Sequence, residues 1–221
     1  SKPQFQRLLD YLLEKVDRAG IQIYLDTIVN LDLVRSLQPD YLITATGSVP
    51  RSLILDGNTT HEHVVQAVEV LTVGEPLTGQ VVVIGGGLLG LDVAEVLSTT
   101  AERVTIIEKG LRVGSILEWN VRKMRLASLR RCGVNIMLQS RLVGCERSAI
   151  LVHNSSGEEE RIHADTLVLA LGSAPNNPLP KLAGALSCPQ TFVGDCRNPA
   201  GLTEALSQGW LAGQVSISHN A

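Results

Sequence analysis

The stretch that decides the fold is QVVVIGGGLLGLDVAEVLSTTAERVTIIE, residues 80–108. Its first five residues form a continuous apolar run, which is typical of a strand that a parallel sheet buries on both faces. Three glycines follow at once, and residues 91–99 carry the pattern of a helix. Residues 103–107 form a second apolar run, which ends in an acid. The segment therefore predicts a βαβ unit of about 30 residues.

The glycines between the first strand and the helix follow the pattern G-x-G-x-x-G. Gly85 permits the tight turn, Gly87 lets the backbone approach a pyrophosphate, and Gly90 lets the helix pack close to the strand. The free amides and the dipole of the helix N-terminus attract a diphosphate without a lysine. The predicted cofactor-binding loop comprises Gly85, Gly86, Gly87, Leu88, Leu89 and Gly90. A purely structural glycine turn is the alternative.

Glu108 ends the second strand, 18 residues after Gly90. An acid at this place accepts hydrogen bonds from the adenosine ribose and repels a 2′-phosphate. NAD is therefore the expected cofactor, and NADP is the less favoured one. Lys109 and Arg112 lie close enough in sequence to weaken the repulsion, and a solvated acid at a strand end is the alternative interpretation.

The chain before this unit predicts four elements. Residues 3–19 place their apolar side chains on one stripe at helical spacing and end at Gly20, which indicates an amphipathic helix. Residues 21–26 alternate between apolar and polar side chains, as in a strand with one buried face. Residues 40–47 predict a strand that ends in a glycine turn, and residues 63–72 predict a short helix.

The chain after this unit continues in α/β fashion. Prolines after residue 175 exclude regular structure for about ten residues. The expected elements are a helix over 116–131, a strand over 134–138, an antiparallel meander over 141–163, a buried strand over 166–171, a strand over 191–193 and a helix over 201–217.

A weak internal symmetry links two of these segments. A strand that ends in glycine occurs at residues 42–47 and again at residues 167–172, each followed by a serine and then by a proline within three residues. The same local pattern, a strand followed by glycine, serine and proline, thus occurs twice in the chain.

Composition excludes several classes of protein. Of 221 residues 44% are hydrophobic and 19% charged, so the chain is not disordered. The formal net charge is −3 without a basic run, which argues against partners such as nucleic acid or an anionic membrane. No apolar stretch is long enough to span a bilayer, and the four cysteines form no C-x-x-C pair for a metal or a redox disulfide. A soluble, cytoplasmic protein is expected.

Several segments together resemble a known family. They are IGGGLLGLDVAEVL with VTIIE, the earlier ITATGSVPR, and the later VLALGSAPNN and TFVGDC. Over nearly the whole chain the sequence resembles the flavoprotein reductases with two dinucleotide-binding domains. It is most similar to the C-terminal region of the NADH:flavin oxidoreductase group that includes 2,4-dienoyl-CoA reductase and trimethylamine dehydrogenase.

The resemblance implies an α/β fold. A Rossmann-like βαβ NAD(P)-binding domain with an antiparallel meander, residues 74–184, is inserted into a partial FAD-type domain of three layers. Residues 1–73 and 185–221 then form the two segments of that partial domain. In the family, a segment like residues 45–47 leads out of the FAD domain, and one like residues 192–195 returns to it. An aspartate equivalent to Asp195 bonds the flavin ribityl chain there. Gly47, Gly172 and Asp195 are therefore added to the predicted cofactor-binding residues, with a helix N-cap as the alternative for Asp195.

Two departures from the family pattern matter. No strand with a second G-x-G-x-x-G precedes residue 1, so the chain is expected to begin after it. FAD is therefore expected in the full-length protein, whose missing N-terminal catalytic and FAD segment is a predicted partner. The incomplete sheet edge also predicts a possible homo-oligomer. Asp92 stands where the family often has glutamate.

Four functional hypotheses follow. In the first, the chain binds NADH and passes hydride to a flavin in the full-length enzyme. In the second, it is a non-catalytic fragment or scaffold that binds NAD or ADP. A disulfide reductase lacks its cysteine pair, and a simple hydroxyl dehydrogenase would need a catalytic histidine or Tyr/Lys set, whereas His153 and His163 lie in the predicted meander. No catalytic residue and no metal ligand is assigned to this chain.

Overall fold

The computed structural model describes residues 3–53, 61–177, 186 and 188–218. The chain falls into two compact units. Residues 1–42 with 179–190 form the first unit, and residues 43–178 with 191–221 form the second. The domain boundaries expected from the family resemblance stay a prediction.

The first unit contains two helices, α1 (Pro3–Arg18) and α2 (Leu31–Leu37). Helix α1 confirms the predicted amphipathic helix, and Gly20 just beyond it has a φ of +63°. Helix α2 lies in a stretch without a predicted element. It begins where the side chain of Asn30 accepts a hydrogen bond from the Leu33 N–H at 2.9 Å, which satisfies one free amide of the first turn.

The predicted strand over residues 21–26 is wrong. These residues pair with no strand in the described part of the chain. Ile23 and Leu25 are 61% and 79% exposed, and Asp26 has a φ of +51°, which interrupts an extended backbone. Alternation favours a strand only when a neighbouring strand supplies the hydrogen bonds, and none lies alongside here.

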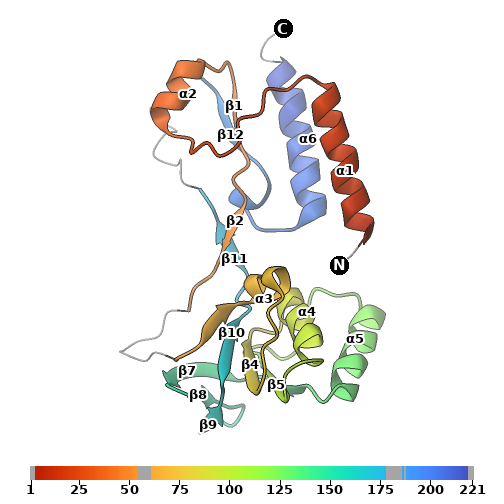
Figure 1. Cartoon of the computed structure of the whole chain (residues 1–221), viewed down its shortest axis with the longest axis vertical. Coiled ribbons are helices and arrows are strands. Elements are labelled where there is room, and N and C mark those ends of the chain that lie inside the picture. The colour runs from red at the N-terminus through yellow and green to blue at the C-terminus, as the bar shows by residue number, and fades with distance from the viewer. Residues whose placement is uncertain (1–2, 54–60, 178–185, 187, 219–221) are drawn as a thin grey trace. The chain divides into compact units, whose positions relative to one another are not determined.

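The second unit is built on a five-stranded parallel sheet of order β3-β10-β4-β5-β6 (Figure 1). Its strands are β3 (Val64–Gln66), β4 (Gln80–Ile84), β5 (Arg103–Ile107), β6 (Asn135–Met137) and β10 (Thr166–Leu169). The strands of the βαβ unit, β4 and β5, pair in parallel from Gln80 opposite Arg103 to Ile84 opposite Ile107. The predicted βαβ unit is confirmed.

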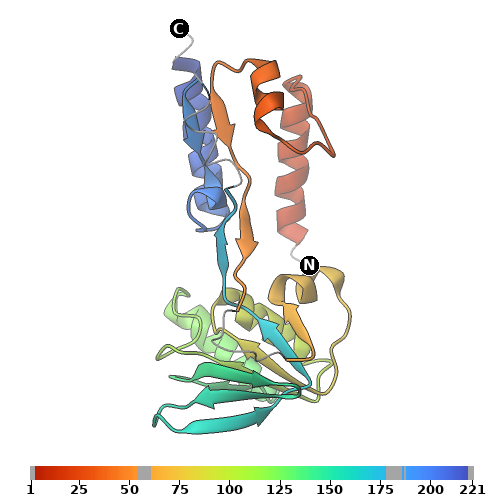
Figure 2. The same ribbon diagram turned by 90° about the vertical axis from the view of Figure 1, so that its left-hand side faces the viewer.

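Each face of this sheet has its own cover, because successive side chains of a strand point to opposite faces. Val81 and Val83 pack on the face covered by α3 (Ala67–Val73), α4 (Leu88–Leu97) and α5 (Trp119–Arg131). Val82 and Ile84 pack under the antiparallel meander of β7 (Arg141–Glu146), β8 (Ala149–His153) and β9 (Glu159–His163) (Figure 2). The predicted α/β fold class with its meander is confirmed.

Three predicted element boundaries are corrected. The helix expected over 63–72 is the edge strand β3 followed by α3, because Val64 and Val65 pair with β10. Helix α4 begins at Leu88 rather than at residue 91, so Gly90 lies inside its first turn. Helix α5 begins at Trp119 rather than at residue 116, where the carboxylate of Glu118 accepts two backbone N–H groups.

The segments that follow the two glycines of the repeated pattern form one two-stranded ribbon. Strands β2 (Ser48–Pro50) and β11 (Ser173–Pro175) pair antiparallel. The Arg51 N–H donates to the Gly172 carbonyl at 3.0 Å, and the Asn176 N–H donates to the Gly47 carbonyl at 2.9 Å. Both glycines have a positive φ, +72° and +76°. The residues after each glycine of the sequence symmetry thus pair with each other, whereas the strands before them, β1 (Leu42–Thr44) and β10, lie in different sheets.

The remaining elements are short strands and one long helix. Strand β1 (Leu42–Thr44) precedes the ribbon, and β12 (Gln190–Phe192) follows it along the chain. The Val193 N–H donates to the Thr44 carbonyl at 3.0 Å. The turn η1 (Gly194–Cys196) and helix α6 (Leu202–Ser218) then complete the second unit and confirm the predicted closing helix.

Candidate dinucleotide-binding site

A cavity of about 800 Å³ lies in the second unit at the carboxyl ends of the parallel strands. Crevices at this edge of an open parallel sheet are where such folds bind their ligands. Seven of the predicted cofactor-binding residues line it: Gly85, Gly87, Leu88, Leu89, Glu108, Gly172 and Asp195. Gly86, Gly90 and Gly47 do not line it.

The glycines of the loop differ in what surrounds them. A Cβ at Gly90 would lie 1.9 Å from the Gly85 carbonyl oxygen, and one at Gly86 would lie 2.2 Å from Cγ1 of Val113. Gly85 has a φ of +110°, and its Cβ would lie 2.4 Å from the Ala170 carbonyl oxygen. A Cβ at Gly87, in contrast, would meet nothing within 4 Å. Three glycines therefore permit close packing, and Gly87 leaves bare backbone open to the cavity.

The N-terminus of α4 supplies hydrogen-bond donors at this opening. Gly87 is the N-cap, and its carbonyl accepts the first bond of the helix from the Leu91 N–H at 3.1 Å. The amides of residues 88–90 therefore have no acceptor within the helix. Together with the helix dipole they form a site that suits an anion. The residues present thus fit the diphosphate of a dinucleotide.

Glu108 ties the glycine loop to the end of β5. Its carboxylate accepts hydrogen bonds from the Gly86 N–H at 2.7 Å and from the Gly110 N–H at 2.6 Å. The same side chain belongs to the cavity wall. Glu108 therefore has a structural role in the loop in addition to the ribose contact predicted for it.

Two cations share the cavity with Glu108, and sequence reasoning found only one of them. Lys109 lines the cavity as its position after β5 suggests, whereas Arg112 is absent from the lining residues. Arg141, the first residue of β7, lines it instead. Arg141 lies far along the chain from the glycine loop, and only the folding of the meander brings it there.

Asp195 holds the turn that precedes α6. One oxygen of its carboxylate accepts the Ala200 N–H at 3.2 Å and the Gly201 N–H at 3.5 Å, and the other accepts the Ser48 hydroxyl at 3.3 Å. Both amides precede α6, which begins at Leu202, so these bonds hold the turn and do not cap the helix. Because Asp195 also lines the cavity, its contact with a flavin stays a prediction.

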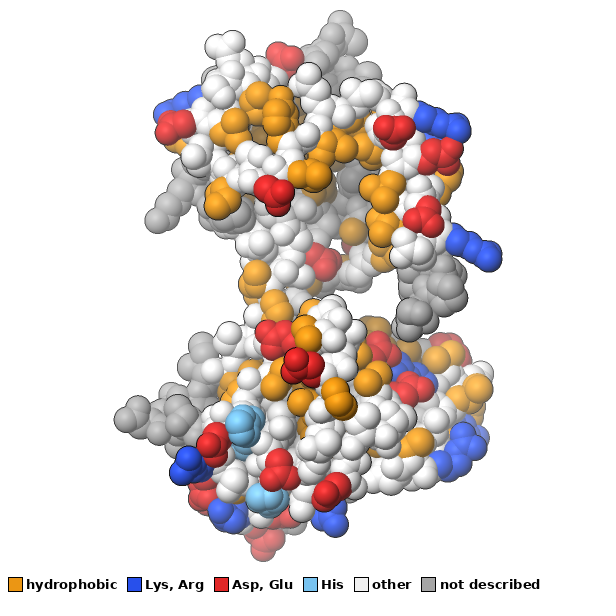
Figure 3. All heavy atoms as spheres, viewed as in Figure 1, with side chains coloured by type: hydrophobic (Ala, Val, Ile, Leu, Met, Phe, Trp, Pro, Cys, Tyr) orange, Lys and Arg blue, Asp and Glu red, His pale blue; other side chains and the backbone are white. Residues whose placement is uncertain are grey.

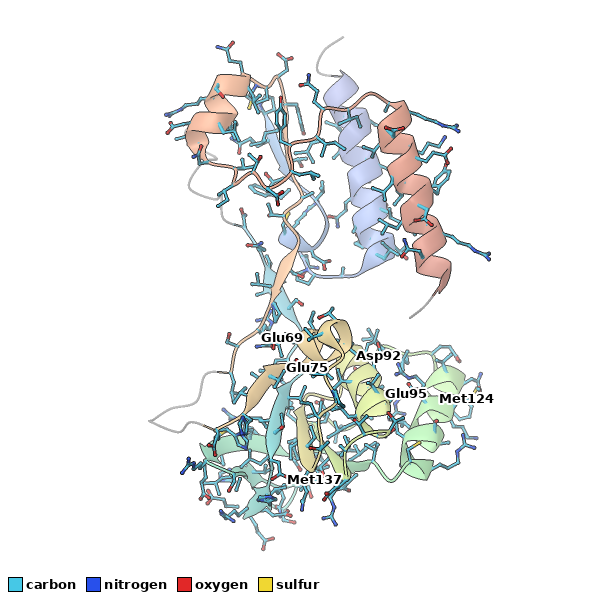
Figure 4. The ribbon with its side chains drawn as sticks, viewed as in Figure 1. Glu69, Glu75, Asp92, Glu95, Met124 and Met137 are labelled. Carbon is cyan, nitrogen blue, oxygen red and sulfur yellow. The ribbon has the colours of Figure 1, made fainter. Side chains whose placement is uncertain are left out.

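Asp92 does not reach the cavity, because Arg125 of α5 binds it. The Arg125 guanidinium lies 2.7 Å from the Asp92 carboxylate and 3.0 Å from that of Glu95. Both acids project from α4 toward α5 (Figure 4). The residue that departs from the family pattern thus serves to join two helices in this structure.

The remaining titratable groups form no evident catalytic cluster in the part of the chain that is described. His153 and His163 are half exposed beside Glu159 and Asp165. No group of three metal-ligating side chains occurs among the described residues, and their cysteines form no disulfide. On the face in Figure 3, acidic and basic side chains are interspersed. Within the described ranges, no helix has the length and apolar character that crossing a bilayer requires.

Comparison with known proteins identifies the family. The model of the pyridine nucleotide-disulphide oxidoreductase family matches residues 5–198. This chain belongs to that family. The resemblance drawn from the sequence is therefore confirmed. Oxidoreductases of this family use FAD and a pyridine nucleotide.

Two curated relatives match almost the whole chain. The bilirubin reductase of Mediterraneibacter gnavus is 26% identical over 97% of this chain. The NADH oxidase of Thermoanaerobacter brockii is 27% identical over 95% of it. In both cases the match covers 33% of the relative, so this chain spans about a third of the length of these relatives.

Solved structures agree on the fold. A 2-naphthoyl-CoA reductase in complex with 2-naphthoyl-CoA superimposes with a TM-score of 0.79 at 24% identity, covering 92% of this chain and 31% of that one. The histamine dehydrogenase of Rhizobium sp. 4-9 gives a TM-score of 0.76 at 18% identity, covering 93% of this chain and 35% of that one.

Proposed function

We propose that this chain is the dinucleotide-binding part of an NAD(P)H-dependent flavin oxidoreductase. It binds NADH at the loop of residues 85–90, and hydride passes from NADH to a flavin in the longer protein. The observation that carries the proposal is the open backbone of Gly87 at the N-terminus of α4, facing a cavity of about 800 Å³. Family membership supports it.

The chain's own residues bind and orient the dinucleotide in this proposal. The amides of residues 88–90 hold the diphosphate, and Glu108 accepts hydrogen bonds from the adenosine ribose. The negative charge of Glu108 favours NAD over NADP. The redox chemistry itself belongs to the nicotinamide and the flavin. FAD is proposed for the full-length protein, with Asp195 and the start of α6 beside it.

A non-catalytic nucleotide-binding module is the second candidate. It is favoured by the glycine loop itself, which offers a place for a diphosphate and no catalytic side chain. The two candidates differ in the purified chain. A flavin absorption spectrum supports the first, and a colourless protein that binds NADH or ADP without turnover supports the second.

The loop assignment is tested by Gly87→Val. The new side chain occupies the space predicted for the diphosphate, so NADH affinity falls by more than about tenfold while the thermal midpoint stays near that of the parent chain. Nicotinamide fluorescence reports binding, and ADP serves as a second probe. Gly209→Val is the matched control, because Gly209 in α6 is also free of neighbours within 4 Å. Unchanged NADH affinity in Gly87→Val contradicts the assignment.

The cofactor preference is tested by Glu108→Gln. The substitution removes the charge and keeps an oxygen that accepts one amide of the loop. The affinity for NADPH then rises relative to that for NADH, measured by the same fluorescence. If the ratio stays constant, the preference is decided by Lys109 and Arg141 rather than by Glu108.

A further inference from the structure

A second cavity lies at the opposite, amino end of the parallel sheet. Its volume is about 300 Å³, and it shares no lining residue with the dinucleotide cavity. Its floor includes Gln80, Arg103 and Asn135, the first residues of β4, β5 and β6, and further along the same strands Val82, Thr105 and Met137. Its wall includes Glu160, Ile162 and His163 of β9, an outer strand of the meander. Nothing in the proposed function uses this cavity.

Strand register explains why the floor residues share one face. Gln80 lies opposite Arg103, Val82 opposite Thr105, and Thr105 opposite Asn135. Alternate residues of a strand point to the same side, and Val82 packs with the cluster under the meander. Met137, two residues after Asn135 on β6 and labelled in Figure 4, belongs to the same face. The cavity therefore lies on this face of the sheet, beside β9, where the side chains of the meander do not fill the space over the floor residues.

Thr105 is the unusual residue of this floor. It is 5% exposed in the middle of β5, where the following residues Ile106 and Ile107 are apolar and buried. No hydrogen bond joins its hydroxyl to a described residue, and the side chain lines the cavity. The hydroxyl is therefore available to a polar group that enters the cavity.

Two charged residues at the cavity form no ion pair with a described residue, in contrast to their neighbours. Arg161 of β9 binds Glu146, and Arg147 binds Glu62. Arg103 and Glu160 form no ion pair with any residue in the described ranges, and both line the cavity. His163 lies 3.1 Å from the carboxylate of Asp165, which therefore balances its charge when it is protonated. The cavity thus presents one free cation and one free anion.

We propose that this cavity binds a small zwitterion, an α-amino acid with an aliphatic side chain. Its carboxylate pairs with Arg103, its ammonium group with Glu160, and its side chain contacts Val82 and Met137. The Thr105 hydroxyl completes the site with a hydrogen bond to the ligand. A volume of about 300 Å³ admits a molecule of this size and is too small for a dinucleotide.

Calorimetric titration of the whole chain with L-leucine tests the charge requirement. Two analogues isolate the charges: 4-methylpentanoate lacks the ammonium group, and 3-methylbutylamine lacks the carboxylate. L-leucine binds at millimolar concentration or below, and each analogue binds more than about tenfold more weakly. Absence of L-leucine binding, or equal binding of either analogue, overturns the proposal.

Thr105→Val tests the site itself, because valine keeps the volume and removes the hydroxyl. L-leucine affinity falls by about tenfold, while NADH affinity is unchanged. Thr166→Val is the matched control, since Thr166 is a buried threonine of the same sheet outside this cavity.

Arg103→Gln, at an exposed position, tests the contact with the carboxylate. The variant binds L-leucine and 4-methylpentanoate more weakly than the parent chain does, and its affinity for 3-methylbutylamine is unchanged. L-leucine affinity that matches the parent chain in Thr105→Val or in Arg103→Gln overturns the proposal.

Discussion

The two ends of the parallel sheet present different surfaces to their cavities. At the carboxyl end, the strands lead into glycines, and bare backbone at Gly87 faces the cavity. At the amino end, polar side chains such as Arg103 and Thr105 face a smaller cavity. Proposed binding at the carboxyl end therefore requires that no side chain fills the space at Gly87. Proposed binding at the amino end requires particular polar side chains. Substitutions at the carboxyl end therefore act through steric overlap, and those at the amino end act through charge and hydrogen bonds.

The largest effect is expected for Gly90→Ala. The new Cβ would lie 1.9 Å from the backbone oxygen of Gly85, which cannot move without shifting the loop. Overpacking of this kind costs about 1–3 kcal/mol or more, although alanine otherwise favours a helix. Thermal unfolding measures the loss. Gly87→Ala is the control in the same loop and leaves the midpoint unchanged, so equal destabilisation by both variants would break the comparison.

A smaller effect is expected for Asp165→Asn at the amino end. The carboxylate accepts the Gln80 N–H at 2.7 Å, and this bond, with His163 nearby, holds the pKa of Asp165 below its usual value of 3.8. A folded-state pKa below the unfolded one stabilises the protein above the unfolded value, and this contribution is lost as the pH falls through the folded value.

The Asn variant is therefore less stable at neutral pH, and its stability falls less steeply below about pH 4. Urea unfolding from neutral to acidic pH measures both. An acid dependence that matches the parent chain would show that other carboxylates carry it.

The smallest effect is expected for Glu62→Gln, just before β3. Arg147 binds this carboxylate at 3.0 Å and thereby lowers the pKa of Glu62 below 4.5. Both side chains are well exposed, 46% and 84%, so water and salt screen the pair. The variant shifts the urea midpoint less than Asp165→Asn, and the shift disappears at high ionic strength. A shift that persists in concentrated salt would mean that the pair acts through packing.

Sequence reasoning succeeded where one segment contains its own partners. Residues 80–108 hold two buried strands and the helix between them, so the pattern is sufficient to predict the βαβ unit. It failed where the partner lies elsewhere. Residues 64–66 form a strand only because β10 lies beside them, and residues 21–26 form none because no strand does. The periodicity of apolar residues shows which face of a segment can be buried. Whether that segment becomes a strand depends on a neighbouring strand that can accept and donate its backbone hydrogen bonds.

The candidate site shows the same division. Gly85, Gly87 and Glu108 could be found from their spacing, since their roles follow from one short loop. Arg141 could not, because the turn into the meander carries it to the cavity. For Asp195 the sequence left a flavin contact or a helix N-cap open, and the structure shows bonds to Ala200 and Gly201 in the turn before α6.

The sequence by itself determined the α/β fold class, the glycine loop and the family, because these depend on residues close together in the chain. Only the tertiary structure decided which glycines pack and which one is open, where the charge of Asp92 is bound, and that a second cavity exists at the amino end of the sheet. The physical reason is that cavities and ion pairs form only when the strands, the helices and the meander pack together. The sequence of a single strand does not show them.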